Sequence, residues 1–323
     1  MGTADDRTPA TSDAGASPFP SAVVGASPSD IARPLDAAAA ALTIALCLSW
    51  GFNQVAVKLA LPEIPPLIQA AFRSTFGALV VVAWARLRGV KLTEADGTLI
   101  PGVIAGVLFG LEFLLIYRGL VWTSASRASL FIYTAPFIVV LGARWLLPAD
   151  RFDRRQWLGL LLSFVGMAVA FGVPTPGGGA QQVIGDVMLV LAGAAWAATT
   201  LVVKATGLVR ASYEKVLLYQ LIVSAPMLAL CAHLFGERVA GPPSAVAMGS
   251  LLYQTFWIAS FTFLAWFALI QRYSASRLSA FTFLTPLFGV AAGHLVLGDP
   301  LTPAFALAVG LVVTGLVLVN RPR

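Results

Sequence analysis

Two ionisable residues that lie deep within apolar segments, Arg73 and Glu112, are the residues of this chain best suited to carry chemistry. A charge at such depth in a membrane costs on the order of 2.5–3.5 kcal/mol, so each side chain must face protein or water. Each residue lies about nine positions, or roughly 13 Å, from the outer end of its segment. The two side chains therefore share a depth and can pair, although Arg118, about one and a half turns above Glu112, is a competing partner.

Glu112 can be interpreted in two ways, as a proton carrier or as part of the framework. An apolar environment disfavours its charged form, whereas a nearby Arg73 favours that form. If the two effects balance, the carboxyl group exchanges protons as the protein changes conformation, and protons become the coupling ion. If Arg73 dominates, the two residues form a structural ion pair that fixes neighbouring helices. The second half of the chain has Gln220 and Thr262 at the equivalent positions, so these charges occur in one half only.

A second set of residues could bind an amphipathic small molecule. Aromatic side chains recur on several apolar segments, and two amide side chains could fix a polar group of a ligand. A binding site that is apolar with a few polar groups suits such a ligand, whereas the alternative is that the aromatic residues face lipid or anchor the membrane interface. The candidate ligand-binding residues are Trp50, Asn53, Phe113, Tyr117, Tyr133, Trp196, Gln254, Phe263, Trp266 and Phe283.

Other kinds of catalytic chemistry find little support in the sequence. His233 and His294 stand alone in separate apolar segments, so neither is expected to bind a metal ion. Cys47 and Cys231 also lie in apolar segments, where a free cysteine behaves as a small hydrophobic residue. The chain contains no phosphate-binding glycine loop and no nucleophile elbow. We therefore expect no metal, no cofactor and no ATP-driven step.

The segments that must position these residues are strongly apolar. Hydrophobic residues make up 58% and charged residues 11% of the 323 residues, and the mean hydropathy is +0.84. Soluble domains carry roughly 25% charged residues, so this composition predicts an all-α integral membrane protein in contact with the lipid bilayer. Ten segments are each long enough to cross a hydrocarbon core of ~30 Å. They lie near 37–60, 64–86, 98–121, 126–147, 156–173, 184–206, 212–236, 244–271, 275–297 and 303–320.

The ten segments form a repeat. Trp50 and Lys58 recur as Trp196 and Lys204, 146 residues later. The Ala-Ser-Arg sequence that ends at Arg127 recurs 150 residues later. Because each repeat holds five segments, the second must enter the membrane from the opposite side. The sequence therefore predicts an inverted repeat, the arrangement by which many secondary transporters open alternately to either face.

The repeat divides the chain into two units. Residues 37–173 form the first five-helix repeat, and residues 184–323 contain the second. Between them, residues 174–183 form a Pro/Gly-rich linker that cannot continue a helix. Residues 1–36 are rich in Ala, Ser, Pro and Asp, and we expect them to form a disordered cytoplasmic tail.

The net charge of +6 indicates membrane orientation and not nucleic-acid binding. Most of the 21 Lys and Arg residues fall on the side of the membrane that holds both termini. On the opposite side lie Lys58, Arg118, Arg127 and Arg238. Positive charges on short loops stay in the cytoplasm, so both termini are predicted to be cytoplasmic. We expect a multi-pass protein of the cell membrane, which in a bacterium is the inner membrane, and no nucleic-acid partner.

Glycines and prolines indicate how the helices pack and bend. Two segments carry glycines four residues apart, namely Gly102, Gly106 and Gly110 in the third and Gly289 and Gly293 in the ninth. This spacing is typical of close helix packing in lipid. Pro136 and Pro286 occupy equivalent positions in the fourth and ninth segments, where each removes a backbone hydrogen bond and kinks its helix. The two prolines are therefore candidate hinges.

These features resemble the EamA family of the drug/metabolite transporter superfamily. The resemblance runs from about residue 42 to 319. It is carried by the opening Trp50-Gly51-Phe52-Asn53, by Arg73, by Trp196, and by the Ser/Ala-rich entries into the fourth and ninth segments with their prolines. It implies ten spans in two EamA-like units with both termini inside. The family carries amino acids, drugs and many metabolites on one scaffold, so the resemblance does not identify the cargo.

The leading hypothesis is a secondary transporter that exports amino acids or other small metabolites or drugs by alternating access. Amino acids are the commonest cargo that the resemblance implies. A gradient-independent facilitator needs the same binding site without a coupling acid. An intramembrane transferase would need clustered His, Asp or Glu near the membrane surface, which the sequence hardly offers. We expect a monomer that is not an enzyme.

Overall fold

The computed structural model describes residues 36–94, 96–146, 154–172, 179–272, 281–282 and 284–320, and within these ranges it contains helices and turns but no strand. Residues 1–35 of the expected tail, residues 174–178 of the linker and the candidate residue Phe283 lie outside the described residues. The helices of the first half are α1 (Ala37–Ala60), α2 (Pro66–Leu87), α3 (Leu99–Trp122), α4 (Ala125–Phe131), the 3₁₀ turn η1 (Ile132–Thr134), α5 (Ala135–Leu146) and α6 (Arg154–Gly172). Those of the second half are α7 (Gly179–Ala205), η2 (Gly207–Arg210), α8 (Tyr213–Leu234), α9 (Ala245–Leu252), η3 (Tyr253–Thr262), α10 (Phe263–Arg272), α12 (Leu284–Leu297) and α13 (Pro303–Asn320).

Five of these helices, α1, α2, α3, α7 and α8, are long and apolar enough to cross a membrane. Shorter apolar helices accompany them, among them Leu284–Leu297 and Pro303–Leu318. Large apolar side chains such as Leu79, Leu161 and Leu307 lie on the outer surface, an arrangement that suits lipid better than water. The all-helical, membrane-spanning character is confirmed, while the count of ten spans and their inverted arrangement stay predictions.

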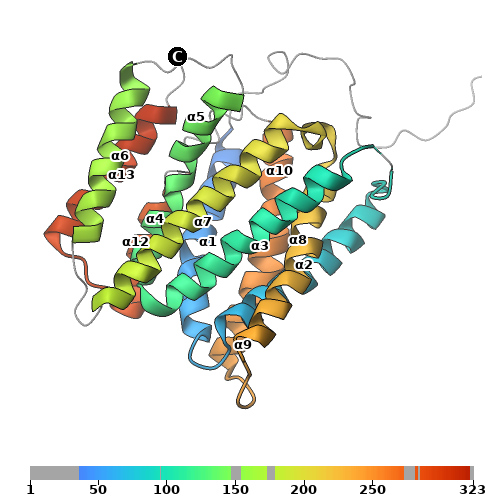
Figure 1. The fold of residues 1–323 in the computed structure, drawn as a ribbon, viewed down its shortest axis with the longest axis horizontal. Coiled ribbons are helices and arrows are strands. Elements are labelled where there is room, and N and C mark those ends of the chain that lie inside the picture. The colour runs from blue at the N-terminus through green and yellow to red at the C-terminus, as the bar shows by residue number, and fades with distance from the viewer. Residues whose placement is uncertain are drawn as a thin grey trace, which may run out of the picture.

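Helices from the two halves pack against one another throughout the molecule (Figure 1). α3 contacts both α7 and α8, α2 packs against α8 and η3, and α1 packs against α12. α6 and α13 pair at the left of the view, and α4 contacts α12. The largest apolar core cluster draws residues from both halves, so the halves share one interior.

The glycines of α3 allow α8 to approach closely. A Cβ atom on Gly102 would lie 2.5 Å from the ring of Tyr219, and one on Gly106 would lie 2.5 Å from the Cβ atom of Val223. Gly110 faces the next turn of α8 in the same way. Since real Cβ atoms do not approach so closely, only glycine fits this ridge. The expected packing role of the GxxxGxxxG pattern is confirmed.

The glycines of α12 play the same part against α4. A Cβ atom on Gly289 would collide with the hydroxyl group of Ser129, and one on Gly293 would collide with that of Ser126. Because lipid provides no hydrophobic drive for helix association, such close backbone contact is a main source of stability between membrane helices.

One helix of the second half contains a π-helical stretch. α9, η3 and α10 form one continuous rod, with α9 at the lower end and α10 at the upper end of Figure 1. Within η3 the hydroxyl group of Ser260 donates to the carbonyl oxygen of Thr255, five residues earlier, at 3.0 Å. Gln254 and Thr262, at either end of η3, are both buried. π-Helical turns occur often at functional sites, which directs attention to these two residues.

The candidate hinge prolines lie near interruptions of their helices. The 3₁₀ turn η1 separates α4 from α5, and Tyr133 within it has non-helical angles (φ −76°, ψ 15°). α5 begins at Ala135, directly before Pro136, and Pro286 is buried in the first turn of α12. The break before Pro136 fits the restriction that proline places on preceding residues. The hinge role of both prolines stays a prediction.

The tight contact between α3 and α8 predicts a large effect of a single methyl group. Gly106→Ala should lower the free energy of unfolding by about 1–3 kcal/mol, the usual cost of overpacking. The matched control is Gly310→Ala, because Gly310 lies in helix α13 with open space around its Cα atom. Thermal unfolding of the purified protein in detergent measures both variants. Equal melting temperatures for the two variants would contradict the packing argument.

Candidate functional site

The central polar cluster comprises Arg73 of α2, Glu112, Phe113 and Tyr117 of α3, and Gln254 of η3. Phe113 and Tyr117 are four residues apart, so they occupy the same face of α3. Glu112 and Tyr117 both interact electrostatically with Arg73. All five side chains are buried in the interior of the protein. The structure therefore brings the expected ion-pair residues together with three of the expected ligand-binding residues.

Arg73 is held by an aromatic ring and not by an acid. Its side chain is 1% exposed, and its guanidinium carbon lies 3.9 Å from the centroid of the Phe113 ring. Its Nε and Nη1 atoms have no hydrogen-bond partner among the described residues. A buried cation over an aromatic ring gains about 2 kcal/mol, which is less than the several kcal/mol that desolvating the ion costs. Arg73 therefore retains unused hydrogen-bonding capacity.

Glu112 lies beside this cation without a direct bond to it. Its side chain is 7% exposed, and none of the ion pairs within the described ranges joins it to Arg73. Arg118, the competing partner, instead lies 3.5 Å from Glu237. The direct salt bridge between Arg73 and Glu112 is thus not formed in this conformation. The coupling role of the two residues stays a prediction.

A chain of buried hydrogen bonds lies next to Arg73. The hydroxyl group of Tyr117 donates to Oε1 of Gln254 at 2.6 Å, and Nε2 of Gln254 donates to Oε1 of Gln69 at 3.1 Å. Nε2 of Gln69 in turn donates to the carbonyl oxygen of Ile64 at 2.8 Å. The chain ties α3, η3 and α2 together and satisfies polar groups that would be costly to bury alone. Gln69 was not among the residues expected from the sequence, although it lies four residues before Arg73 on the same helix face.

Trp50 anchors a second group of the expected residues. Its Nε1 atom donates to the hydroxyl oxygen of Thr262 at 2.9 Å. Its ring meets that of Trp266 edge-on at 5.4 Å between centroids and that of Phe263 at 6.4 Å. Asn53, one turn further along α1, is buried, and its Oδ1 atom has no partner among the described residues. This group joins α1 to η3 and α10.

Trp196, which follows Trp50 by 146 residues, anchors a third group. Its ring meets that of Tyr133 edge-on, with 5.8 Å between the centroids, and so joins α7 to the break in the α4–α5 span. The expected ligand-binding residues therefore fall into three groups, around Arg73, Trp50 and Trp196. Their roles in binding a ligand stay a prediction.

The strongest buried ion pair of the described residues was missed by the sequence analysis. Nε of Arg127 donates to both oxygens of Asp186 at 3.1 Å, and Nη2 donates to Oδ2. The hydroxyl group of Thr123 donates to Oδ1 at 2.6 Å. The two charged side chains are 4% and 0% exposed. Asp186, near the start of α7, was not among the expected site residues, and packing of α4 and the end of α3 against α7 buries it completely.

Lys58 seals the neighbouring helix end. Its ammonium group donates to the carbonyl oxygens of Leu120 and Thr123, both at 2.9 Å, where α3 ends. Carbonyl groups at a helix C-terminus lack intrahelical partners, and a cation there is favourable. Asp299, whose Oδ2 atom accepts from the backbone N–H of Ser126, adds a negative charge near Lys58. One end of the bundle is thus closed by a network of charges.

The comparison with known protein families bears on both halves of the chain. Residues 37–172 and residues 183–321 each match the EamA-like transporter family. The chain belongs to this family. The expected family resemblance is therefore confirmed, and the EamA signature extends over nearly all of the described helices.

Relatives of the chain are transporters by name. An uncharacterized transporter, YvbV, of Bacillus subtilis (strain 168) is 29% identical over 85% of this chain and 89% of its own length. A probable amino-acid metabolite efflux pump of Salmonella typhimurium is 25% identical over 85% of this chain and 92% of its own. An uncharacterized inner membrane transporter, YedA, of Escherichia coli (strain K12) is 21% identical over 85% of this chain and 88% of its own length.

A solved crystal structure has the same fold as this EamA protein. Its sequence is 21% identical to this one, and the match covers 86% of this chain and 96% of the solved chain with a TM-score of 0.63. At this identity the likeness concerns the fold alone. The family and the named relatives together identify a multi-pass membrane protein from a family of transporters.

The Arg127–Asp186 pair generates a prediction about stability. Asp186→Asn should cost about 3–5 kcal/mol, because it leaves the Arg127 cation buried without a counter-charge. Glu94→Gln is the control, since it breaks an exposed ion pair with Lys91 in which the side chains are 78% and 60% exposed for Lys91 and Glu94. That control should leave the melting temperature unchanged. If both variants melt at the same temperature as the parent, the buried pair does not contribute to stability.

Proposed function

We propose that this protein is a ten-span secondary transporter that exports small metabolites, amino acids among them, by alternating access between two inverted five-helix units. The observation that carries the proposal is the two-fold pattern of contacts between the halves. Membership of the EamA-like family supports transport, and the relative named as a probable amino-acid metabolite efflux pump supports this cargo.

The two-fold pattern is seen when each helix of the first half is matched with its counterpart in the second half. α1 then corresponds to α7, α2 to α8, α3 to the α9–η3–α10 rod, α4–α5 to α12, and α6 to α13. The contact of α1 with α12 corresponds to that of α7 with α5, and the contact of α3 with α8 corresponds to that of η3 with α2. The α2–α8, α4–α12 and α6–α13 pairs correspond to themselves. Such a pattern supports two structural repeats related by a pseudo-two-fold axis, on which rocking transporters are built.

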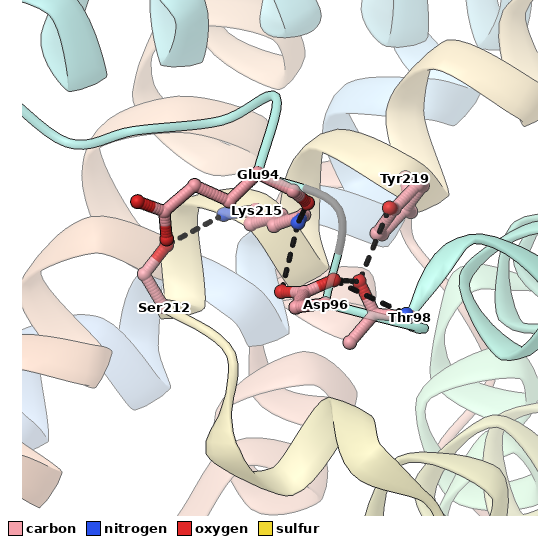
Figure 2. Close-up of polar contacts among 6 residues, drawn as sticks. All are labelled: Glu94, Asp96, Thr98, Ser212, Lys215 and Tyr219. Carbon is pink, nitrogen blue, oxygen red and sulfur yellow. Dashed lines mark hydrogen bonds and ion pairs between the residues drawn. The ribbon is translucent and has the colours of Figure 1, made fainter.

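A polar latch joins the halves at one end of the molecule, and we call it the Asp96 latch (Figure 2). The ammonium group of Lys215, in the first turn of α8, donates to the carbonyl oxygen of Glu94 and to Oδ2 of Asp96, both at 2.8 Å. Thr98 donates to Oδ1 of Asp96, and its hydroxyl group lies 3.2 Å from that of Tyr219. Hydrogen bonds from Lys215 and Thr98 lower the pKa of Asp96 below its ordinary value.

A second latch, the Glu237 latch, joins the halves at the opposite end. Oε2 of Glu237, which follows α8, accepts from the backbone N–H groups of Leu67 and Ile68 at 2.8 and 3.2 Å in the first turn of α2. Glu63 accepts hydrogen bonds from the hydroxyl group and the backbone N–H group of Ser244. Both bonds lower the pKa of Glu63, and the bond from the hydroxyl group has the larger effect. Each latch thus ties the start of α2 or α8 to a loop of the other unit.

The latches suit alternating access because they lie at the two ends of the same helix pair, α2 and α8. Opening toward one face requires one latch to break while the other holds. The ligand can bias this equilibrium only by binding the two states with different affinities. The central cluster around Arg73 lies between the two latches along α2, where a substrate would contact both units.

The latches predict reciprocal effects on amide hydrogen exchange. Asp96→Asn should raise exchange at residues 90–98 and lower it at residues 64–68, because the population shifts toward the state that is open at the Asp96 end. Glu237→Gln should produce the opposite pattern. Hydrogen-exchange mass spectrometry on the purified protein measures both. If each variant raises exchange at both ends, the latches are general stabilisers and not gates.

The Asp96 latch also predicts a pH dependence. Because the pKa of Asp96 is lowered in the folded protein, the stability that it contributes is present above its unfolded pKa of about 3.9. That stability is lost as the pH falls through the folded pKa. Exchange protection at residues 90–98, corrected for the intrinsic rate, should therefore be constant from pH 8 to pH 5. A loss of protection within this range would contradict ionised Asp96 as the partner of Lys215.

Proton coupling through Glu112 is the mechanistic part of the proposal. Efflux of labelled amino acids from proteoliposomes should accelerate when a pH gradient drives protons inward, and Glu112→Gln should abolish this dependence. The physical reason is that removal of the titratable group leaves no site at which a proton and the cargo exchange. Equal gradient dependence in both proteins would exclude Glu112 as the coupling residue. Efflux that ignores the gradient in both would favour the facilitator.

A further inference from the structure

We infer that Arg73 and Glu112 form the two charged ends of a binding site for a zwitterionic solute, with the solute carboxylate on Arg73 and its ammonium group on Glu112. This inference rests on the proposed transport function and names the class of solute. The juxtaposition that carries it is a fully buried cation and a nearby buried acid that are not bonded to each other.

The first step is the unused capacity of Arg73. One face of its guanidinium group is covered by the Phe113 ring at 3.9 Å, while Nε and Nη1 have no partner among the described residues. Contact through the face leaves the N–H groups in the guanidinium plane free. A guanidinium group binds a carboxylate through two parallel hydrogen bonds that use Nη2 together with either Nε or Nη1. Nε and Nη1 of Arg73 are therefore each free to donate to an oxygen of a carboxylate.

The second step is that the neighbouring polar groups do not use this capacity. Tyr117, Gln254 and Gln69 donate to one another and to a backbone carbonyl group. Their hydrogen bonds are satisfied without Arg73. Within the described ranges, no side-chain acceptor thus binds Nε or Nη1 of Arg73.

The contacts of Arg73 differ from those of the buried Arg127. Where a buried arginine serves the framework, as with Arg127 and Asp186, the acid receives several short hydrogen bonds from the guanidinium group. Arg73 and Glu112 interact electrostatically but form no such bonds. If Arg73 and Glu112 served to hold helices together, we would expect direct hydrogen bonds between them as well. The separation leaves each charge available to a group of opposite sign.

The opposite charges of Arg73 and Glu112 favour a solute that carries both a positive and a negative charge. A solute with only negative charge would be attracted by Arg73 and repelled by Glu112, and a simple amine would meet the reverse. A zwitterion with its two charges a few atoms apart compensates both residues at once. Placing opposite charges together in a low-dielectric interior recovers much of the cost of burying them. An α-amino acid has this charge arrangement.

The test compares matched ligands on the full-length protein in nanodiscs. The probes are the twenty L-amino acids, together with the amide and the deaminated acid of each one that binds, and binding is measured by calorimetry. At least one amino acid should bind, and its amide and its deaminated acid should each bind at least tenfold more weakly. If no amino acid binds, or if the amide or the acid binds as tightly, the assignment is overturned.

Variants assign the two ends of the site. Arg73→Lys keeps the charge but loses the planar fork, so amino-acid affinity should fall at least tenfold while affinity for the amide is unchanged. Glu112→Gln should weaken the amino acid at least tenfold and leave the deaminated acid unaffected or tighter. Arg86→Lys, at an exposed arginine near the end of α2, is the control and should bind as the parent does. Equal affinity of Arg73→Lys and the parent would overturn the carboxylate assignment.

Transport measurements separate this inference from the proposed function. If amino acids bind with the predicted dependence on Arg73 but do not cross proteoliposome membranes, the site assignment stands and the transport proposal fails. If organic cations or neutral solutes are transported at a rate that Arg73→Lys leaves unchanged, the protein is a transporter and the assignment is wrong.

Discussion

The absence of water in the hydrocarbon core is the constraint on which the rest of this structure depends. Every polar group placed between the helices must find its partner within the protein. At one end of the bundle this requirement is met fully, because Arg127, Asp186, Thr123 and Lys58 satisfy one another and the end of α3. In the middle it is met for Tyr117, Gln254 and Gln69 but not for Arg73. The contrast separates buried groups whose hydrogen bonds hold the fold together from a buried cation whose Nε and Nη1 have no partner among the described residues.

Close contact between backbones makes these polar networks possible. The glycines of α3 and α12 bring α8 and α4 near enough for their side chains to reach across. Because these contacts join the two halves, the interior is shared, and a displacement of one half must repack the boundary. The polar latches at the two ends of α2 and α8 lie on this same boundary, where small motions change many contacts together.

Much of this architecture could be predicted from the sequence. Composition indicated a membrane protein, glycine spacing indicated the packing of α3, and the depth of Arg73 and Glu112 indicated a shared location. What could not be predicted depends on contacts between distant segments. Asp186 lies near the start of its helix and gave no sign of burial until α4 packed against α7. Likewise, the stacking of Phe113 on Arg73 could not be predicted, because relative helix rotation is set by neighbouring helices and not by the local sequence.

The π-helical stretch of η3 coincides with an irregularity in the repeat. Ser244, which caps α9, follows Thr98, which precedes α3, by 146 residues, whereas Phe263 follows Phe113 by 150. Four extra residues therefore fall between these points in the second copy, and the ten residues of η3 lie within that interval. Four residues are close to one α-helical turn of 3.6 residues. This part of the α9–η3–α10 rod is therefore about one turn longer in sequence than the matching part of α3, and the wide turns of η3 lie within the longer segment.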